Sequence, residues 1–177
     1  MVQPRHRRGA ITDPLVLSTH SSPLGKIITI TQGDALVALD FEDFEDRLHA
    51  TLKQKFPGTA IKKSGTQRTL KVALKDYFAG DIRALKSLPV KMRGTDFQNQ
   101  VWRALRKIPA GKTVSYGALA ERVGRPGAAR AVGLANGSNP IALVVPCHRV
   151  IGSNGALTGY GCGIERKRWL LEHEGAI

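Results

Sequence analysis

The chain has 177 residues, 42% of them hydrophobic, which is enough for one large domain or two small ones with a real core and excludes a largely disordered protein. Its formal net charge of +13 points to a polyanionic partner, nucleic acid above all. This charge is spread along the chain, since residues 1–92 hold 15 basic and 9 acidic side chains and residues 93–177 hold 12 and 5. Two cysteines exclude a disulfide scaffold, no His/Cys cluster has the spacing of a metal site, and no stretch reaches the roughly 18 apolar residues of a membrane span. We therefore expect a reduced, intracellular protein without a metal.

Residues 13–84 predict a small α/β domain, which follows a short basic N-terminus over 1–12 that we expect to be flexible. Three β-rich runs separated by turns predict an antiparallel meander over 15–19, 26–31 and 35–41. Asp43 can cap a helix that runs to about Phe56, and a second helix is expected over 66–78. No residue of this domain is a candidate for catalysis.

A linker is expected over 85–93, followed by a mostly helical second domain over 94–177. Thr95 or Asp96 can cap a helix over 97–108, whose apolar residues recur at helical spacing. Trp102, in this helix, is expected to anchor the core rather than to stack on a base.

Two short helices follow, over 116–123 and 128–136, and the glycine-containing turn between them is typical of a helix-turn-helix. The second helix consists largely of small or apolar residues, and Arg130 is its only charge. A helix that reads base edges in the major groove presents several polar side chains, so this helix suits a close approach to DNA that tolerates any sequence.

Cys147 and His148 are adjacent at the end of the apolar run 141–145, which predicts a buried strand that delivers the cysteine to the rim of the domain. A thiol is a nucleophile as thiolate, and a nearby imidazole is a usual activator. Neighbours in a strand point to opposite faces, so His148 needs a water bridge or a turn to act on Cys147. Taken alone, the pair fits a buried thiol beside a satisfied histidine better than a reactive site.

Several motifs in order resemble the O6-alkylguanine-DNA alkyltransferases: Arg130-Ala131-Val132-Gly133, Asn136-Gly137-Ser138-Asn139-Pro140, Pro146-Cys147-His148-Arg149-Val150, Gly159-Tyr160 and the C-terminal Trp169 to Gly175. The resemblance implies an N-terminal antiparallel sheet with helices and a helical C-terminal domain that contains the helix-turn-helix and the cysteine. It also implies a DNA repair protein that flips O6-alkylguanine out of duplex DNA and moves the alkyl group irreversibly to Cys147, once per molecule and without a cofactor. We expect a monomer whose partner is alkylated double-stranded DNA, in the cytoplasm or in a nucleus.

The resemblance further implies roles for particular residues. His148 acts through water and Glu174 orients it, with Glu172 as the competing carboxylate. Asn139 is a hinge between the recognition helix and the active-site strand, and Arg130 takes the place of the flipped base. The other implied contacts to DNA or substrate are Tyr116, Ser115, Ala129, Arg125, Ser153, Tyr160 and Gly161. Tyr160 would donate to the leaving base, whereas Tyr116 could press on the phosphate or the base, or merely pack.

The loop that would cover the substrate departs from the family at one residue, because Cys162 stands where a glycine is usual. Cys162 is either a tolerated small residue or one that narrows the pocket and slows bulky O6-benzyl substrates. Activity on O4-alkylthymine stays open. Three other functions compete with repair. An alkyltransferase-like protein, which binds lesions without repairing them, lacks the reactive cysteine, so the presence of Cys147 disfavours it. A DNA-binding regulator is disfavoured by the small-residue helix, and a Cys-His hydrolase would need an oxyanion motif, of which none is visible.

Overall fold

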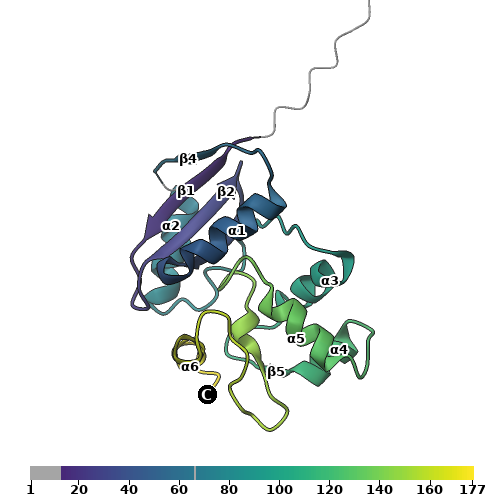
Figure 1. The fold of residues 1–177 in the computed structure, drawn as a ribbon. Coiled ribbons are helices and arrows are strands. Elements are labelled where there is room, and N and C mark those ends of the chain that lie inside the picture. The colour runs from purple at the N-terminus through teal and green to yellow at the C-terminus, as the bar shows by residue number, and fades with distance from the viewer. Residues whose placement is uncertain (1–12, 66) are drawn as a thin grey trace, which may run out of the picture.

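The structure is a computed structural model that describes residues 13–65 and 67–177, so the basic N-terminus expected over 1–12 lies outside the described residues. An N-terminal half built on a sheet packs against a C-terminal half built mainly of helices (Figure 1). No helix among the described residues is long and apolar enough to cross a membrane. The mixed α/β fold confirms the predicted fold class.

The N-terminal half contains the predicted meander. Its strands are β1 (Leu15–His20), β2 (Ile27–Gln32) and β3 (Ala35–Phe41), each antiparallel to the next. A short fourth strand, β4 (Ile61–Lys63), pairs with β1 in parallel and makes the strand order β3-β2-β1-β4. The sheet is therefore mixed, because the chain crosses over through a helix before it returns to the edge of β1.

One helix covers each face of this sheet (Figure 1). On one face, α1 (Glu45–Lys55) buries Leu48 and Leu52 against a separate small core of sheet residues. On the other face, α2 (Arg68–Phe78) joins a larger core that continues into the C-terminal half. This continuity means that the two halves share one hydrophobic core, which fixes their relative position.

The predicted cap of α1 is wrong. A 3-10 turn, η1 (Glu42–Phe44), precedes α1, and the first turn of the helix has no side-chain cap. The Asp43 carboxylate instead accepts a 2.8 Å hydrogen bond from Arg166 in the C-terminal half. The extra turn moves Asp43 away from the amide groups that open α1.

The outer edge of β3 connects the sheet to the rest of the chain. Leu36 donates to the carbonyl of Pro89 and accepts from Lys91, both at 2.9 Å, so part of the expected linker lies along β3. Further along the same edge, Leu39 forms a bridge to Ile141, at the start of the segment that leads to Cys147. The backbone of β3 thereby positions the active-site segment.

The C-terminal half contains the remaining elements: α3 (Asp96–Leu105), β5 (Val114–Ser115), α4 (Tyr116–Arg122), α5 (Ala129–Gly137), η2 (Cys147–Arg149), β6 (Val150–Ile151) and α6 (Ile164–His173). Of the two candidate caps of α3, Thr95 is the one used, in a capping box with Gln98. The expected core anchor is confirmed, since Trp102 is buried and its indole N–H donates to the carbonyl of Ala135 at 2.8 Å. This bond joins α3 to α5.

Candidate active site

Cys147 lies in a tight turn and not at the end of a strand, so the predicted strand over 141–145 is wrong. The chain forms a single bridge at Ile141 and then turns, with Leu143 in the left-handed region at φ +66°. The Asn139 amide holds this turn: its oxygen accepts from the Ile141 amide at 3.0 Å and its nitrogen donates to the Val145 carbonyl at 2.7 Å. These side-chain bonds replace the ladder that a strand needs. Asn139 thus ties the end of α5 to the turn before Cys147.

His148 follows Cys147 in the 3-10 turn η2 and is completely buried. Its Nε2 lies 2.9 Å from Oε1 of Glu174, while Nδ1 has no hydrogen-bond partner among the described side chains and backbone. A carboxylate on one ring nitrogen leaves the other free to accept a proton. Of the two candidate carboxylates, Glu174 makes this contact, whereas Glu172 is exposed.

The Glu174 carboxylate is the centre of a larger buried network. Arg149 donates to both of its oxygens, through Nε at 2.8 Å and a terminal nitrogen at 2.9 Å, and Tyr77 of α2 donates to Oε1 at 2.7 Å. Burial alone would raise the pKa of Glu174, but the hydrogen bonds from His148 and Arg149 outweigh burial and hold that pKa well below its ordinary value. Glu174 is therefore a carboxylate at neutral pH.

Burial sets the protonation state of the reacting pair. It raises the pKa of Cys147 even though Asn139 and the charge of Lys167 favour the thiolate, and it lowers the pKa of His148 even though Glu174 favours the imidazolium. At neutral pH the resting pair is consequently a thiol and a neutral imidazole. A neutral imidazole is able to take the proton of a thiol.

A small pocket of about 10 Å³ lies over Cys147. Its walls come from the end of α5, from the loop 159–162 and from two residues of the N-terminal half, Asp40 and Arg47. Tyr160, on this loop, is buried and its hydroxyl has no partner among the described residues, so the hydroxyl is available to a ligand. Gly159 adopts φ +62°, and a Cβ there would lie 3.0 Å from the Tyr116 hydroxyl, so a larger residue would strain the loop.

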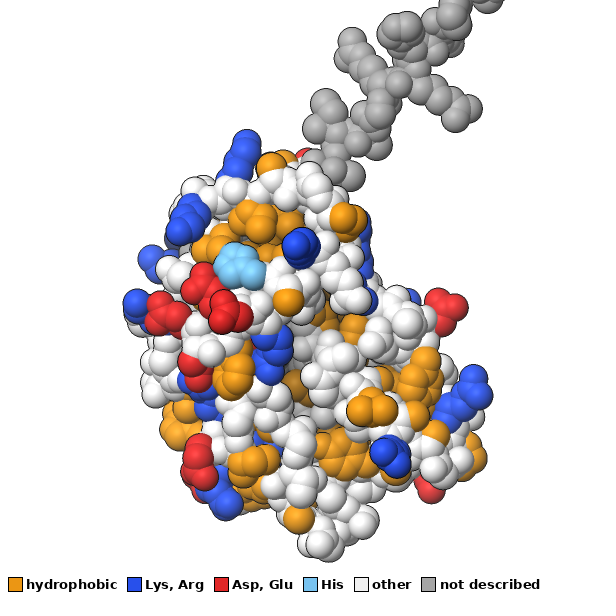
Figure 2. Space-filling model, viewed as in Figure 1, with side chains coloured by type: hydrophobic (Ala, Val, Ile, Leu, Met, Phe, Trp, Pro, Cys, Tyr) orange, Lys and Arg blue, Asp and Glu red, His pale blue; other side chains and the backbone are white. Residues whose placement is uncertain are grey.

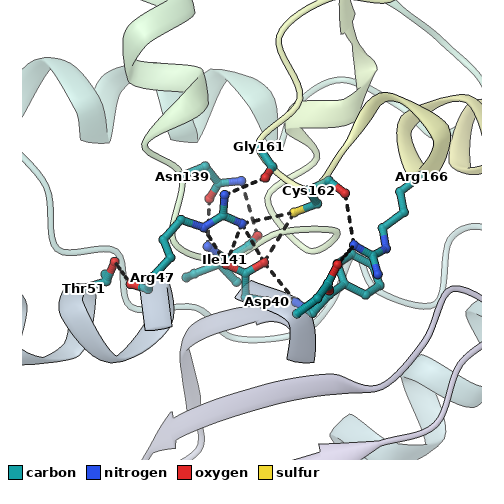
Figure 3. Close-up of polar contacts among 10 residues, drawn as sticks. Asp40, Arg47, Thr51, Asn139, Ile141, Gly161, Cys162 and Arg166 are labelled. Atoms are coloured by element: carbon teal, nitrogen blue, oxygen red, sulfur yellow. Dashed lines mark hydrogen bonds and ion pairs between the residues drawn. The ribbon is translucent and has the colours of Figure 1, made fainter. Parts of the chain in front are cut away.

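Arg47 holds this loop in place from α1 (Figure 3). Its guanidinium pairs with both oxygens of Asp40 and donates to the Gly161 carbonyl at 2.6 Å. Cys162 lies beside this pair, with its sulfur 3.4 Å from an Asp40 oxygen and 3.6 Å from Arg47. Sequence reasoning assigned no role to the N-terminal half, because two charges on a strand and a helix resemble ordinary surface residues until folding brings them to the pocket.

The predicted DNA contacts fall into three groups. Ser115 caps α4 by accepting from the Ala118 amide at 3.1 Å, and Ala129 opens α5. The Tyr116 hydroxyl donates to the Thr158 carbonyl at 3.1 Å, which joins α4 to the covering loop. Arg130, Arg125 and Ser153 are exposed, and among the described residues none makes a side-chain hydrogen bond or ion pair. Figure 2 shows uncharged and hydrophobic side chains over much of the surface of α4 and α5.

Sequence reasoning missed two further polar residues at the site. Lys167 of α6 is buried, and its ammonium donates to the carbonyls of Val150 at 2.5 Å and Thr158 at 2.6 Å. Burial lowers its pKa to about 8, although Cys147 acts in the opposite direction. Asn136 is also buried and donates to the Cys147 carbonyl at 3.4 Å. Neither residue stands out in the sequence, because a lysine or an asparagine in a helix usually faces solvent.

No group of His, Cys, Asp and Glu in the described ranges is arranged to hold a metal ion. Helices α4 and α5 form the helix-turn-helix, and the second of them ends next to the cysteine pocket. The fold and the site together define a class: a DNA-binding protein with a buried cysteine nucleophile.

Comparison with known proteins gives the family. Residues 15–92 match the ribonuclease-like domain, and residues 96–176 the DNA binding domain, of 6-O-methylguanine DNA methyltransferase. A methylated-DNA–protein-cysteine methyltransferase of Shigella flexneri is 47% identical over 165 residues, covering 89% of this chain and 94% of the relative. One of Mycobacterium bovis is 62% identical over 101 residues, covering 57% and 61%.

Solved structures agree with these relatives. The O6-methylguanine methyltransferase of Mycobacterium tuberculosis has a TM-score of 0.75 at 44% identity, covering 92% of this chain and 93% of the other. Its complex with DNA has a TM-score of 0.76 at 44% identity, covering 91% and 93%. The chain belongs to the 6-O-methylguanine DNA methyltransferase family, which confirms the resemblance. It is a DNA repair methyltransferase that transfers an alkyl group from DNA to a cysteine.

Proposed function

We propose that Cys147 is the cysteine that accepts the alkyl group, that the substrate is O6-alkylguanine in duplex DNA, and that each molecule reacts once. One observation carries the assignment: Cys147 shares a buried turn with His148, whose Nε2 is fixed by Glu174 at 2.9 Å and whose Nδ1 has no protein partner. This arrangement supplies a nucleophile, a base and an orienting carboxylate.

In the reaction, the sulfur of Cys147 attacks the alkyl carbon, the S–C bond forms and the C–O6 bond breaks. The thiol proton passes through a water molecule to Nδ1 of His148, and Glu174 stabilises the imidazolium. The electron pair of the broken bond leaves with guanine, to which the Tyr160 hydroxyl is placed to donate a hydrogen bond. Guanine takes up one proton from solvent, and the imidazolium of His148 releases one proton to solvent. The products are a thioether and guanine. The thioether has no route back to the thiol in this site, so the protein is consumed.

The alkylated base must leave the DNA stack before Cys147 can reach it, at a cost of a few kcal/mol. We assign Arg130, exposed on α5, to the gap that the base leaves, and Tyr116 to the contact between α4 and the substrate. The supporting contacts would come from Ser115, Ala129, Arg125 and Ser153, which lie on or beside the helix-turn-helix and the covering loop. Asn139 supports catalysis by holding the turn before Cys147.

A pocket of about 10 Å³ is too small for a purine, so we propose that the loop over Cys147 moves when the base enters. The loop is held by Arg47 and Tyr116, through hydrogen bonds to Gly161 and Thr158 that can break without unfolding the core. In this proposal, binding of the flipped base would replace these contacts with contacts to the base.

All parts of the site come from one chain, so we propose that a monomer is active. A DNA substrate would place the protein in the cytoplasm of a bacterium or in a nucleus.

Intact mass and peptide mapping test the assignment. The protein is mixed with duplex DNA that contains one O6-methylguanine, alongside Cys147→Ala and the matched control Cys162→Ala. We expect one methyl group on the Cys147 peptide in the native chain and in Cys162→Ala, and none in Cys147→Ala. A methyl group on another residue, or transfer by Cys147→Ala, would refute the proposal. A parallel duplex with O4-methylthymine shows whether that base is also a substrate.

A further inference from the structure

Tyr77 belongs to α2 in the N-terminal half, yet its hydroxyl reaches the carboxylate that orients His148. The hydroxyl donates to Oε1 of Glu174 at 2.7 Å, and only 1% of Tyr77 is exposed. The ring is held from a second side by His173, whose Nε2 donates to the Tyr77 carbonyl at 2.7 Å and whose ring lies 5.2 Å away, edge to face. Tyr77 is therefore fixed, with one direction available for its O–H bond.

The oxygen that Tyr77 contacts is the one that His148 contacts. Oε1 of Glu174 accepts three hydrogen bonds, from His148 at 2.9 Å, from Arg149 at 2.9 Å and from Tyr77 at 2.7 Å. Oε2 accepts a hydrogen bond from Arg149 alone. Each donor withdraws charge from an acceptor, so a third donor on Oε1 makes that oxygen a weaker hydrogen-bond acceptor for the imidazole N–H. Burial and the charge of Glu174 raise the pKa of Tyr77 far above its ordinary value, so the hydroxyl remains a donor.

We propose that Tyr77 is a positioning residue for alkyl transfer, which acts through Glu174 to orient His148 and to limit how strongly its imidazole binds a proton. The inference rests on the proposed roles of Cys147 and His148. It also gives the N-terminal half a part in the chemistry, because the hydrogen bond crosses from one half of the chain to the other.

The groups that face His148 come from several elements. Arg149 and Cys147 flank it in η2, Glu174 and Lys167 come from the C-terminal helix region, and the Tyr160 ring of the covering loop lies 6.4 Å away. The charges of Arg149 and Lys167 lower the pKa of His148, whereas the hydrogen bond and the charge of Glu174 raise it. Tyr77 changes this balance without adding a charge of its own.

The test is Tyr77→Phe in the full-length protein, which keeps the ring and removes only the hydroxyl. The rate of methyl transfer from duplex O6-methylguanine is measured in single turnover between about pH 5 and 9. Without the third donor, Oε1 binds the imidazole proton more tightly. We expect the acid limb of the rate profile to move up by about one pH unit and the plateau to fall about 3- to 10-fold, effects of the size of one lost hydrogen bond.

Phe78→Leu is the matched packing control, because Phe78 is the next residue of α2 and packs near Trp169 without touching the carboxylate. It should lower the melting temperature and leave the acid limb where it is. An acid limb in Tyr77→Phe that coincides with the native one would overturn the proposal, even if the rate falls, since lost packing alone would lower the rate.

NMR titration of the His148 ring in the two proteins tests Tyr77 independently of activity. We expect a higher pKa for His148 in Tyr77→Phe, and equal values would overturn the inference. Transfer that survives in Cys147→Ala would instead refute the proposed function, while this titration would still decide the role of Tyr77.

Discussion

Arg47 of α1 donates a 2.6 Å hydrogen bond to the carbonyl oxygen of Gly161, so the N-terminal half holds the loop that covers Cys147. The same guanidinium makes a bidentate pair with Asp40 at the end of β3, whose edge also carries the segment that leads to the cysteine. Strand β3 and helix α1 of the N-terminal half thus position two parts of the pocket, the segment that leads to Cys147 and the covering loop. This explains why the N-terminal half, which holds neither cysteine, is part of the site.

We expect Arg47→Met to loosen the covering loop. The Arg47 side chain is 41% exposed, so its ion pair is partly screened, and the loss of stability should be about 1 kcal/mol. Hydrogen exchange of the amides of 159–163 should become faster, and the melting temperature should fall by a few degrees. Lys53→Met, an exposed change on the same helix, is the control and should alter neither. Unchanged exchange in Arg47→Met would show that the loop is held by other contacts.

Cys162 should limit the size of the alkyl group. Its side chain is buried in the wall of the pocket that contains Cys147, so it takes up space that a glycine would leave free. We expect Cys162→Gly to react faster than the native chain with O6-benzylguanine and at a similar rate with O6-methylguanine in DNA. Cys162→Ser, which keeps the volume, should behave like the native chain. Equal rates with the benzyl substrate in all three proteins would mean that Cys162 is simply a tolerated small residue.

Glu174→Gln should impair both the reaction and the fold. The change leaves Arg149 without a buried counter-charge, which should cost about 3 kcal/mol of unfolding free energy, and it should slow methyl transfer about 100-fold because His148 loses its orienting charge. The pKa of Glu174 is lowered in the folded protein, so this stabilisation is fully present above about pH 4.5 and disappears as the pH falls further.

Glu172→Gln is the matched control, because Glu172 is an exposed carboxylate two residues away. Urea unfolding at pH 7 and single-turnover rates should distinguish the two variants clearly. Similar losses of stability and rate in both variants would show that Glu174 has no special role.

The transfer rate should be nearly constant from pH 8 down to about 6.5, the ordinary pKa of histidine, and should fall only at lower pH. Burial lowers the pKa of His148, so the imidazole stays neutral and able to accept the thiol proton at pH values where an exposed histidine is protonated. Single-turnover rates checked against circular dichroism at each pH would test this. A midpoint at or above pH 6.5 would contradict the assigned proton acceptor.

Arg130→Ala should affect DNA substrates and not the free base. If Arg130 fills the gap in the stack, its loss should slow transfer from duplex O6-methylguanine about 10- to 100-fold and leave the reaction with free O6-benzylguanine unchanged. The exposed Arg68→Ala, in α2, controls for the loss of one positive charge. An equal effect on both substrates would place Arg130 in the chemistry rather than in base flipping.

The sequence by itself determined the meander over β1–β3, the helix-turn-helix, the cysteine and its histidine partner, and the family. These features depend on local patterns: alternating apolar residues, glycine turns and ordered motifs along one stretch of chain. It could not distinguish a strand from a turn over 141–145, because a buried run of five apolar residues fits both. The side chain of Asn139 decides the turn, through bonds to Ile141 and Val145.

The tertiary structure alone decided which distant residues meet at Cys147. Motifs near the C-terminus left two carboxylates as candidates for orienting His148. Folding brings Glu174 to His148, whereas Glu172 is exposed to solvent. Tyr77 and Arg47 reach the site from positions 71 and 101 residues before His148 in the chain. Such contacts arise because the two halves share one core, and the residue pattern of a single segment does not predict them.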